Sequence, residues 1–415
     1  MNDQIAMPTG VALDPFAPGF YADPYPQYAA LREHDPVHRA FIGGFLVTRW
    51  HDVNTLMRDP STSVEDRNLT VPNAIVAAIA EATGVDAERN GRGLLRLDPP
   101  DHTRIRRLVS KAFTPRSVEL LRPRIVALVD SLLTTAAERG DGRIDVIADL
   151  AFPLPFAVIS EMLGLPPGDQ DQLRDWSHTL VQSLDPILAM TKMDEILEAS
   201  DRIVEAVTEA IAWKRTRPDD DDLLNALIKA DEGGQGLTDL ELIDNVVLLF
   251  LAGHETMVNV IGNSTLALLR HPDQADLLRR TPELDGNAVE ELLRYDCPVQ
   301  FSRRILLQPL DIGGRKVDAG EFVMTGLGAA NRDLDHFGPT AGELDLTRAD
   351  ANQHLAFGSG VHYCLGAAVA RLEAREAIPT LFRRFPRMTV LDDPPAWNGR
   401  LILRGLDTLN VSLDG

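Results

Sequence analysis

The stretch Phe357-Gly358-Ser359-Gly360-Val361-His362-Tyr363-Cys364-Leu365-Gly366 decides the fold. Cys364 follows two glycines and precedes a third, and an apolar run with helical spacing begins at Leu365. The cysteine is therefore predicted to lie where a glycine-rich loop enters a helix. Backbone N–H groups and the positive helix end point at the sulfur there, so we expect a lowered thiol pKa and a favoured thiolate. The glycines let the backbone approach a flat group. A purely structural cysteine is the alternative.

This stretch resembles the haem-binding loop of the cytochrome P-450 family, the haem-thiolate monooxygenases. The family pattern is Phe-Gly-x-Gly-x-His-x-Cys-x-Gly, and all six specified positions match. The resemblance implies a mainly α fold with a small β region, the cytochrome P-450 fold. It also implies haem b as cofactor, with Cys364 as the iron ligand and with Phe357, Gly358, His362 and Gly366 in contact with the haem. The resemblance extends from about residue 20 to the end.

Composition narrows the function classes. The chain has 415 residues and a net charge of −21, which argues against a nucleic-acid partner. Its two cysteines, Cys297 and Cys364, exclude a disulfide scaffold and suit a reducing cytoplasm; we interpret Cys297 as an apolar filler. No signal peptide is visible in 1–19, and the longest apolar run, 246–252, is too short to span a bilayer. We expect a cytoplasmic bacterial monomer without a membrane anchor, with an irregular arm over 1–22 and a single domain over 23–415.

A long buried helix is predicted over about 238–271. Thr238 and Glu241 form a capping box, and no proline follows before Pro272. About 33 residues would give a helix of roughly 50 Å. Its apolar middle is interrupted by Ala252-Gly253-His254-Glu255-Thr256. Ala252 and Gly253 leave room beside the helix, and Thr256 can bond the carbonyl at 252 and open a bulge.

Glu255 and Thr256 offer an acid and a hydroxyl for proton relay. The five residues match the family's oxygen-activating motif, Ala-Gly-x-(Asp/Glu)-Thr, which implies that Glu255 and Thr256 are catalytic. A kink that only binds water is the alternative.

Basic side chains for the haem propionates are implied by the resemblance at three places, one of which is His362 in the cysteine loop. His102 and Arg106 lie four residues apart and share a helix face. The resemblance implies that they hold one propionate, and a solvated basic helix is the alternative. Arg304, in an extended segment after Pro298, aligns with the family's second propionate arginine. Arg303 is one residue away, and the sequence leaves the choice open.

A structural clamp behind the cysteine loop is implied by the Glu-x-x-Arg pair Glu291 and Arg294 together with Arg348. The surroundings of Arg348 depart from the commoner pattern, because Leu344 stands where phenylalanine is usual. We expect no catalytic part for these three residues.

The substrate pocket is implied by the resemblance to include Leu248, Leu251, Ala252, Val299, Phe301 and Leu403. Alternation places Val299 and Phe301 on one face of their segment. Residues 401–403 and 409–413 suit a closing hairpin whose turn reaches the pocket, and 60–96 corresponds to a mobile loop over it. The apolar lining predicts a lipophilic substrate, and a steroid, terpenoid, fatty acid or polyketide all stay open.

The resemblance implies insertion of one oxygen atom from O2, as hydroxylation or epoxidation. No flavin or nicotinamide fingerprint is visible, so electrons are expected from NAD(P)H through an external ferredoxin and reductase. Basic clusters at 104–116 and 371–384 are expected to steer an acidic ferredoxin, with a solvated helix face as the alternative. Two rival classes stay open: a peroxide-using or isomerising haem-thiolate enzyme, and a non-catalytic haem-based sensor.

Overall fold

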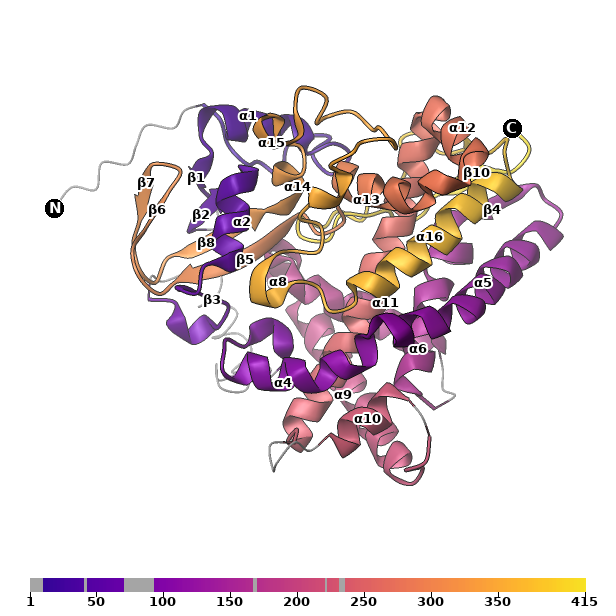
Figure 1. Cartoon of the computed structure of the whole chain (residues 1–415), viewed down its shortest axis with the longest axis horizontal. Coiled ribbons are helices and arrows are strands. Elements are labelled where there is room, and N and C mark those ends of the chain that lie inside the picture. Colours follow the sequence, from indigo (N-terminus) through magenta and orange to yellow (C-terminus); the bar gives the residue numbers. More distant parts are fainter. Residues whose placement is uncertain (1–9, 41–42, 71–92, 167–169, 221, 231–235) are drawn as a thin grey trace.

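Helices make up most of the structure. The computed structural model describes the chain except for residues 1–9, 41–42, 71–92, 167–169, 221 and 231–235. The expected mainly α fold with a small β region is confirmed (Figure 1). The helices are α1 (Tyr25–His34), α2 (Trp50–Arg58), α4 (Asp101–Val109), α5 (Pro115–Glu138), α6 (Pro153–Leu163), α7 (Gln170–Leu180), α8 (Pro186–Thr191), α9 (Met193–Arg215), α10 (Leu223–Lys229), α11 (Asp239–Arg270), α12 (Pro272–Arg280), α13 (Asp285–Tyr295), α14 (Leu327–Ala330), α15 (Leu334–Phe337) and α16 (Ala367–Arg384).

The strands form three small sheets. The largest has the order β1-β2-β8-β5-β3, with β2 and β8 parallel and the other pairs antiparallel. A separate hairpin, β6–β7, turns at Gly313-Gly314. The strands are β1 (Val37–Arg39), β2 (Phe45–Val47), β3 (Thr62–Ser63), β4 (Arg143–Asp145), β5 (Phe301–Leu306), β6 (Leu310–Ile312), β7 (Arg315–Val317), β8 (Phe322–Gly326), β9 (Thr389–Val390) and β10 (Asn410–Ser412).

The expected hairpin between 401–403 and 409–413 is wrong. Val411 of β10 pairs instead with Ile144 of β4 and with Val390 of β9, in a sheet of order β4-β10-β9. Leu403 makes an isolated bridge to Val299. Residues 401–403 therefore form a loop beside the segment that leads into β5. The last strand of the chain, β10, belongs to a different sheet.

Helix α11 is the central element. Its predicted capping box is present, because the Thr238 hydroxyl accepts from the Glu241 amide (3.2 Å) and the Glu241 carboxylate accepts from the Thr238 amide (2.9 Å). The helix is apolar and long enough to cross a membrane, yet 67% of its most apolar window is buried inside the protein. One half packs with α6 and α9, and the other packs with α5, α13 and α16. It therefore joins two apolar cores, and Figure 1 shows it running through the middle of the molecule.

The N-terminal arm has no regular element between residues 10 and 22, although Leu13 and Phe20 are buried. Most of the expected mobile loop at 60–96 lies outside the described residues, which resume at 93. The organisation of 23–415 as one domain stays a prediction.

Candidate active site

The cysteine loop is shaped by two glycines with left-handed backbone. Gly358 has φ of +70° and Gly360 of +72°, and the Cys364 amide donates to the Phe357 carbonyl at 2.9 Å. Gly360 packs directly on the backbone of Met57 and Arg58 at the end of α2, where a side chain would collide. The loop is thus held against a fixed helix end. Cys364 comes three residues before α16, as predicted.

The environment of Cys364 corrects one expectation. Burial of the thiol dominates and raises its pKa above the ordinary value. The amides of Gly366 and Ala367 and the guanidinium of Arg106 oppose this effect and lower the pKa. The helix start lowers the pKa of Cys364 as expected, but this effect is smaller than that of burial. The thiolate consequently needs a further positive partner.

The acid–hydroxyl pair lies in the middle of α11. The Thr256 hydroxyl donates to the Ala252 carbonyl at 2.9 Å, as predicted, but α11 continues through these residues without interruption. Ala252 is exposed although most of the helix around it is buried. Gly253 packs against Ile159 of α6, so the room expected beside it is filled.

Glu255 points into a polar cluster. It is buried, and its carboxylate accepts from Arg400 at 3.3 Å. His178 lies 3.9 Å from the same carboxylate. Sequence reasoning missed both partners, because His178 and Arg400 are 222 residues apart and neither belongs to a local motif.

Four basic side chains converge beside the cysteine loop, from α4, β5 and the loop itself. The rings of His102 and His362 have centroids 4.3 Å apart, and charges on Arg106 and Arg304 also act on His362. Burial, together with these neighbours, lowers the pKa of His362 to about 3. None of the four forms an ion pair with another described residue. We name these residues the basic cluster: His102, Arg106, Arg304 and His362.

The basic cluster fits an anionic group. The buried Nε2 atom of His102 has no partner among the described residues. The Arg304 side chain is buried, donates only to backbone carbonyls of Arg303 and Met57, and has its pKa lowered by burial to about 10. Asp98 acts on His102 and Arg304 only at longer range. Two carboxylates of a flat cofactor would satisfy these donors, with a thiol nearby as metal ligand.

The structure separates the two neighbouring arginines. Arg303 pairs with Asp66 at 2.6 Å and donates to the Val64 carbonyl at 3.0 Å, so its donors are engaged. Arg304 points to the opposite side of β5 and joins the basic cluster. This arrangement favours Arg304 as the propionate arginine.

The six pocket candidates do not all meet. Leu248 and Leu251 pack at the border of the α6–α9–α11 core, and Ala252 is exposed beside them. Val299 and Leu403 are bridged. Phe301 is not brought to that surface, because its ring packs edge-on against Tyr28 of α1, with the ring centroids 5.7 Å apart, in a separate apolar cluster. Alternation alone did not reveal that the extended segment before β5 changes its packing partner between residues 299 and 301.

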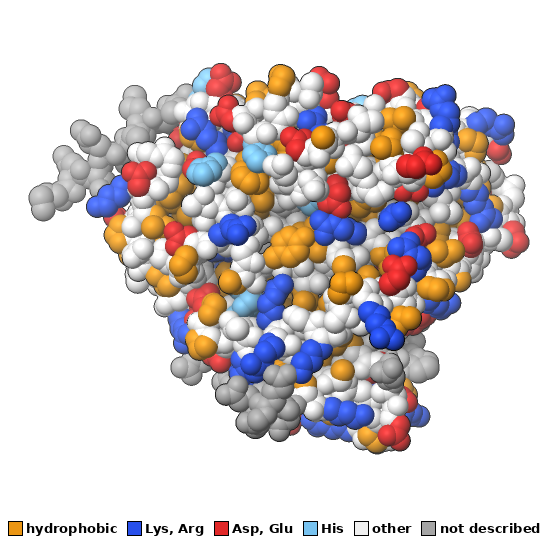
Figure 2. Space-filling view, in the orientation of Figure 1, with side chains coloured by type: hydrophobic (Ala, Val, Ile, Leu, Met, Phe, Trp, Pro, Cys, Tyr) orange, Lys and Arg blue, Asp and Glu red, His pale blue; other side chains and the backbone are white. Residues whose placement is uncertain are grey.

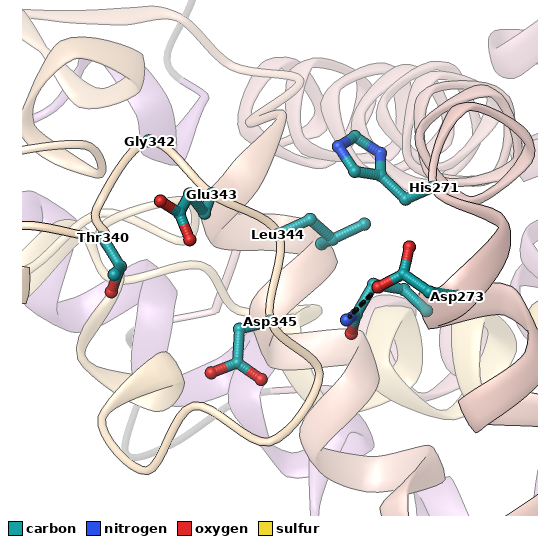
Figure 3. Close-up of a pocket in the computed structure, with 8 residues that line it drawn as sticks. His271, Asp273, Thr340, Gly342, Glu343, Leu344 and Asp345 are labelled. Carbon is teal, nitrogen blue, oxygen red and sulfur yellow. Dashed lines mark hydrogen bonds between the residues drawn. The ribbon is translucent and has the colours of Figure 1, made fainter.

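The clamp is assembled as expected. Glu291 and Arg294 are fully buried and 2.7 Å apart, and Arg348 lies 3.3 Å from the same carboxylate. Arg294 also donates to the carbonyls of Ala341 (2.6 Å) and Glu343 (2.9 Å). These bonds fix the 340–345 loop, which lines a polar surface hollow of about 440 Å³ with His271 and Asp273 (Figure 3). Cys364 and the basic cluster are not part of that hollow.

The class of protein is settled by comparison with known families and structures. The cytochrome P450 family model matches residues 77–281 and 283–402. The chain is 42% identical to cytochrome P450 107B1 of Saccharopolyspora erythraea, over 95% of this chain and 96% of that protein. It is 39% identical to vitamin D(3) 25-hydroxylase of Pseudonocardia autotrophica, over 96% of both chains. A crystal structure of epothilone D-bound cytochrome P450epoK superposes with a TM-score of 0.87 at 31% identity, covering 97% of this chain and 99% of that one.

The chain belongs to the cytochrome P450 family. It is a P450 monooxygenase, similar over its full length to bacterial members.

Proposed function

We propose that this chain holds haem b through Cys364 and the basic cluster, and inserts an oxygen atom from O2 into a lipophilic small molecule. One observation carries the proposal. A cysteine at the start of α16 lies beside four basic side chains that have no carboxylate partner in the described chain. When bound, haem activates dioxygen, and a thiolate ligand increases electron density at its iron.

The chain's own residues have distinct roles in this proposal. Arg106, Arg304, His102 and His362 bind the propionates by charge-assisted hydrogen bonds. Phe357, Gly358 and Gly366 shape the loop, with Gly366 open on its Cβ side. The Thr256 hydroxyl donates its proton in a hydrogen bond to the Ala252 carbonyl. Glu255, the preceding residue of α11, is proposed to supply protons to this hydroxyl.

The substrate is proposed to be a lipophilic molecule of moderate size. Leu248, Leu251, Ala252, Val299 and Leu403 offer an apolar lining. The names of two relatives, which mention vitamin D(3) and epothilone D, support this class. Lipophilic ligands of this kind gain affinity chiefly from buried apolar area.

Electrons are proposed to come from an external ferredoxin and its NAD(P)H reductase. Figure 2 shows Lys and Arg side chains over the face that carries α4 and α16. A hollow of about 670 Å³ lies on the outer side of the cysteine loop and is lined by Arg58, Gly360, Val361 and Tyr363 among others. Arg104 and Arg371 are engaged by Glu241 and Glu290, so the exposed Arg116 and Arg375 are the better candidates for steering.

A reconstitution experiment tests the function. Purified holoenzyme would be titrated with lipophilic compounds while the haem spectrum is followed, and then supplied with NAD(P)H through a surrogate ferredoxin system. We expect a shift from low to high spin with one class of compounds and an oxygenated product. Turnover with peroxide alone, and none with the ferredoxin system, would refute the proposal that electrons come from an external ferredoxin and reductase. Retention of a thiolate spectrum in Cys364→Ala would overturn the ligand assignment.

The docking face has its own test. Arg116→Glu and Arg375→Glu are expected to slow electron transfer and weaken its salt dependence. Arg202→Glu on α9 changes net charge equally and serves as the control. Equal rates in all three variants would refute steering by this face. Both cysteines are free, which agrees with the proposed cytoplasmic location.

A further inference from the structure

Three elements far apart in sequence meet at the carboxylate of Glu255. Arg400, from the loop before β10, donates to it at 3.3 Å, and His178 of α7 lies 3.9 Å away. Arg400 also reaches the ring nitrogens of His178, at 3.0 and 3.1 Å. The three side chains thus form a closed triangle that ties α7 and the 400 loop to α11.

The solvent exposure within this triangle is uneven. Glu255 and Arg400 have side chains that are 6% and 4% exposed. The His178 side chain is 51% exposed. His178 is consequently the member of the triangle that can exchange protons with water directly.

A second histidine near Glu255 is unsuited to this task. His254 lies 3.8 Å from the carboxylate but is fully buried. Its Nδ1 donates to the Phe250 carbonyl at 2.7 Å, since a carbonyl only accepts, and its Nε2 is 3.0 Å from the Ser177 hydroxyl. Both ring nitrogens are engaged and none reaches solvent.

The contact with Arg400 favours the neutral form of His178. A guanidinium only donates, so the ring nitrogen that accepts from Arg400 carries a lone pair and the imidazole is neutral. If His178 takes a proton from water, that hydrogen bond is lost and two cations face each other. The Glu255 carboxylate is then the anion nearest to both.

We propose that His178 relays protons from solvent to Glu255, and that the contact with Arg400 restores His178 to its neutral form. This inference rests on the proposed role of Glu255. In the relay, an N–H bond of the protonated imidazole breaks and an O–H bond forms on Glu255, after a ring rotation or through one water, because 3.9 Å is too long for a direct hydrogen bond. His178 returns to the neutral state, accepts again from Arg400, and takes its next proton from water. The reaction consumes protons, so the net flow is inward.

The charges around His178 set when the relay operates. The facing groups are Arg400, Glu255, Asp407, Arg174 and His254. Partial desolvation of the ring and then the charge of Arg400 lower the pKa of His178, while Glu255 and Asp407 oppose this. The neutral ring is therefore the resting form at neutral pH, and protonated His178 is a transient donor.

Nuclear magnetic resonance tests the coupling without turnover. The His178 ring would be titrated in the reduced, carbon monoxide-bound holoenzyme. Glu255→Gln is expected to lower the His178 pKa further and Arg400→Gln to raise it, while His38, which pairs with Asp35 at 2.9 Å elsewhere, stays unchanged. An unchanged His178 titration in both variants would overturn the proposal, whether or not the enzyme turns over.

Kinetics test the relay itself. His178→Gln is expected to lower product formed per NAD(P)H consumed about tenfold, to raise the solvent isotope effect, and to remove one ionisation from the pH profile of kcat. The spectral Kd for substrate is expected to stay within about twofold. His38→Gln makes the same substitution in a histidine–carboxylate pair outside the site and should change none of these. A wild-type pH profile and isotope effect in His178→Gln would refute the relay.

Discussion

The rings of His102 and His362 lie with centroids 4.3 Å apart and planes tilted by 53°. They come from α4 and from the cysteine loop, so this contact joins the helix that carries Arg106 to the loop that carries Cys364. Arg106 reinforces the joint by donating to the Tyr363 carbonyl at 2.6 Å. The helix that would bind a haem propionate and the loop that would bind the iron are therefore held together by contacts within the protein itself.

The His102–His362 contact predicts a pH-dependent stability. The pKa of His362 is about 3 in the folded chain against an ordinary value of 6.5. Between those values the unfolded chain binds a proton that the folded chain does not, so stability is present above pH 6.5 and is lost as pH falls. The loss is at most about 1.4 kcal/mol per pH unit. Urea unfolding of the apoprotein from pH 7 to 5 measures it.

Two comparisons check the His362 prediction. His362→Gln is expected to flatten the pH dependence of the unfolding free energy. Haem binding is also expected to flatten this pH dependence, because propionates stabilise the protonated ring of His362. An equally steep dependence in His362→Gln would assign the effect to another group.

Arg304 and Arg303 are expected to differ in their effect on haem retention. Arg304→Met removes a buried cation from the basic cluster and should lower haem affinity at least about tenfold. Arg303→Met removes an ion pair with Asp66 and should leave haem affinity nearly unchanged. Transfer of haem to apomyoglobin gives the rates. Faster loss from Arg303→Met than from Arg304→Met would reverse the assignment.

Substitutions at two glycines of the cysteine loop are expected to distinguish effects on protein stability from effects on cofactor binding. Gly360→Ala places a side chain against the Met57 backbone at φ of +72° and should cost at least about 2 kcal/mol of stability. Gly366→Ala meets no protein atom within 4 Å. It should leave apoprotein stability within about 0.5 kcal/mol but lower haem content.

Gly342→Ala is the matched control for the two loop glycines. That position is also open within 4 Å and belongs to the 340–345 loop. Calorimetry and haem content should both stay at wild-type values. Normal haem content in Gly366→Ala would show that the backbone at 366 does not approach the cofactor.

The buried clamp is expected to be costly to break. Arg294→Met leaves the buried Glu291 carboxylate with Arg348 as its remaining ion-pair partner and frees three carbonyls, so the unfolding free energy should fall by about 3 kcal/mol. Arg280→Met, which loses an exposed pair with Asp276, should cost less than about 1 kcal/mol. Similar losses in the two variants, measured in urea, would contradict the clamp.

Local patterns in the sequence predicted the central features well. The capping box at Thr238, the helix after Cys364 and the Thr256–Ala252 bond all depend on residues a few positions apart. Four motifs in the right order also identified the family, and therefore the fold, without any knowledge of contacts.

Features that depend on distant contacts were out of reach. The closing hairpin was wrong because Val411 pairs with Ile144, far earlier in the chain. Phe301 could not be placed because its packing partner, Tyr28, belongs to α1, far away in the sequence. The net pKa shift of Cys364 was mispredicted because burial, which no local pattern reveals, outweighs the helix end. His178 and Arg400 carried no signal at all.

The basic cluster makes the folded chain depend on an anion from outside. Four basic side chains stand together with no carboxylate partner among the described residues, so filling the site stabilises only the folded state. A chain made while haem is scarce would stay nearer its unfolding threshold and be degraded faster. The cell's stock of this enzyme would then follow its haem supply as well as its rate of synthesis.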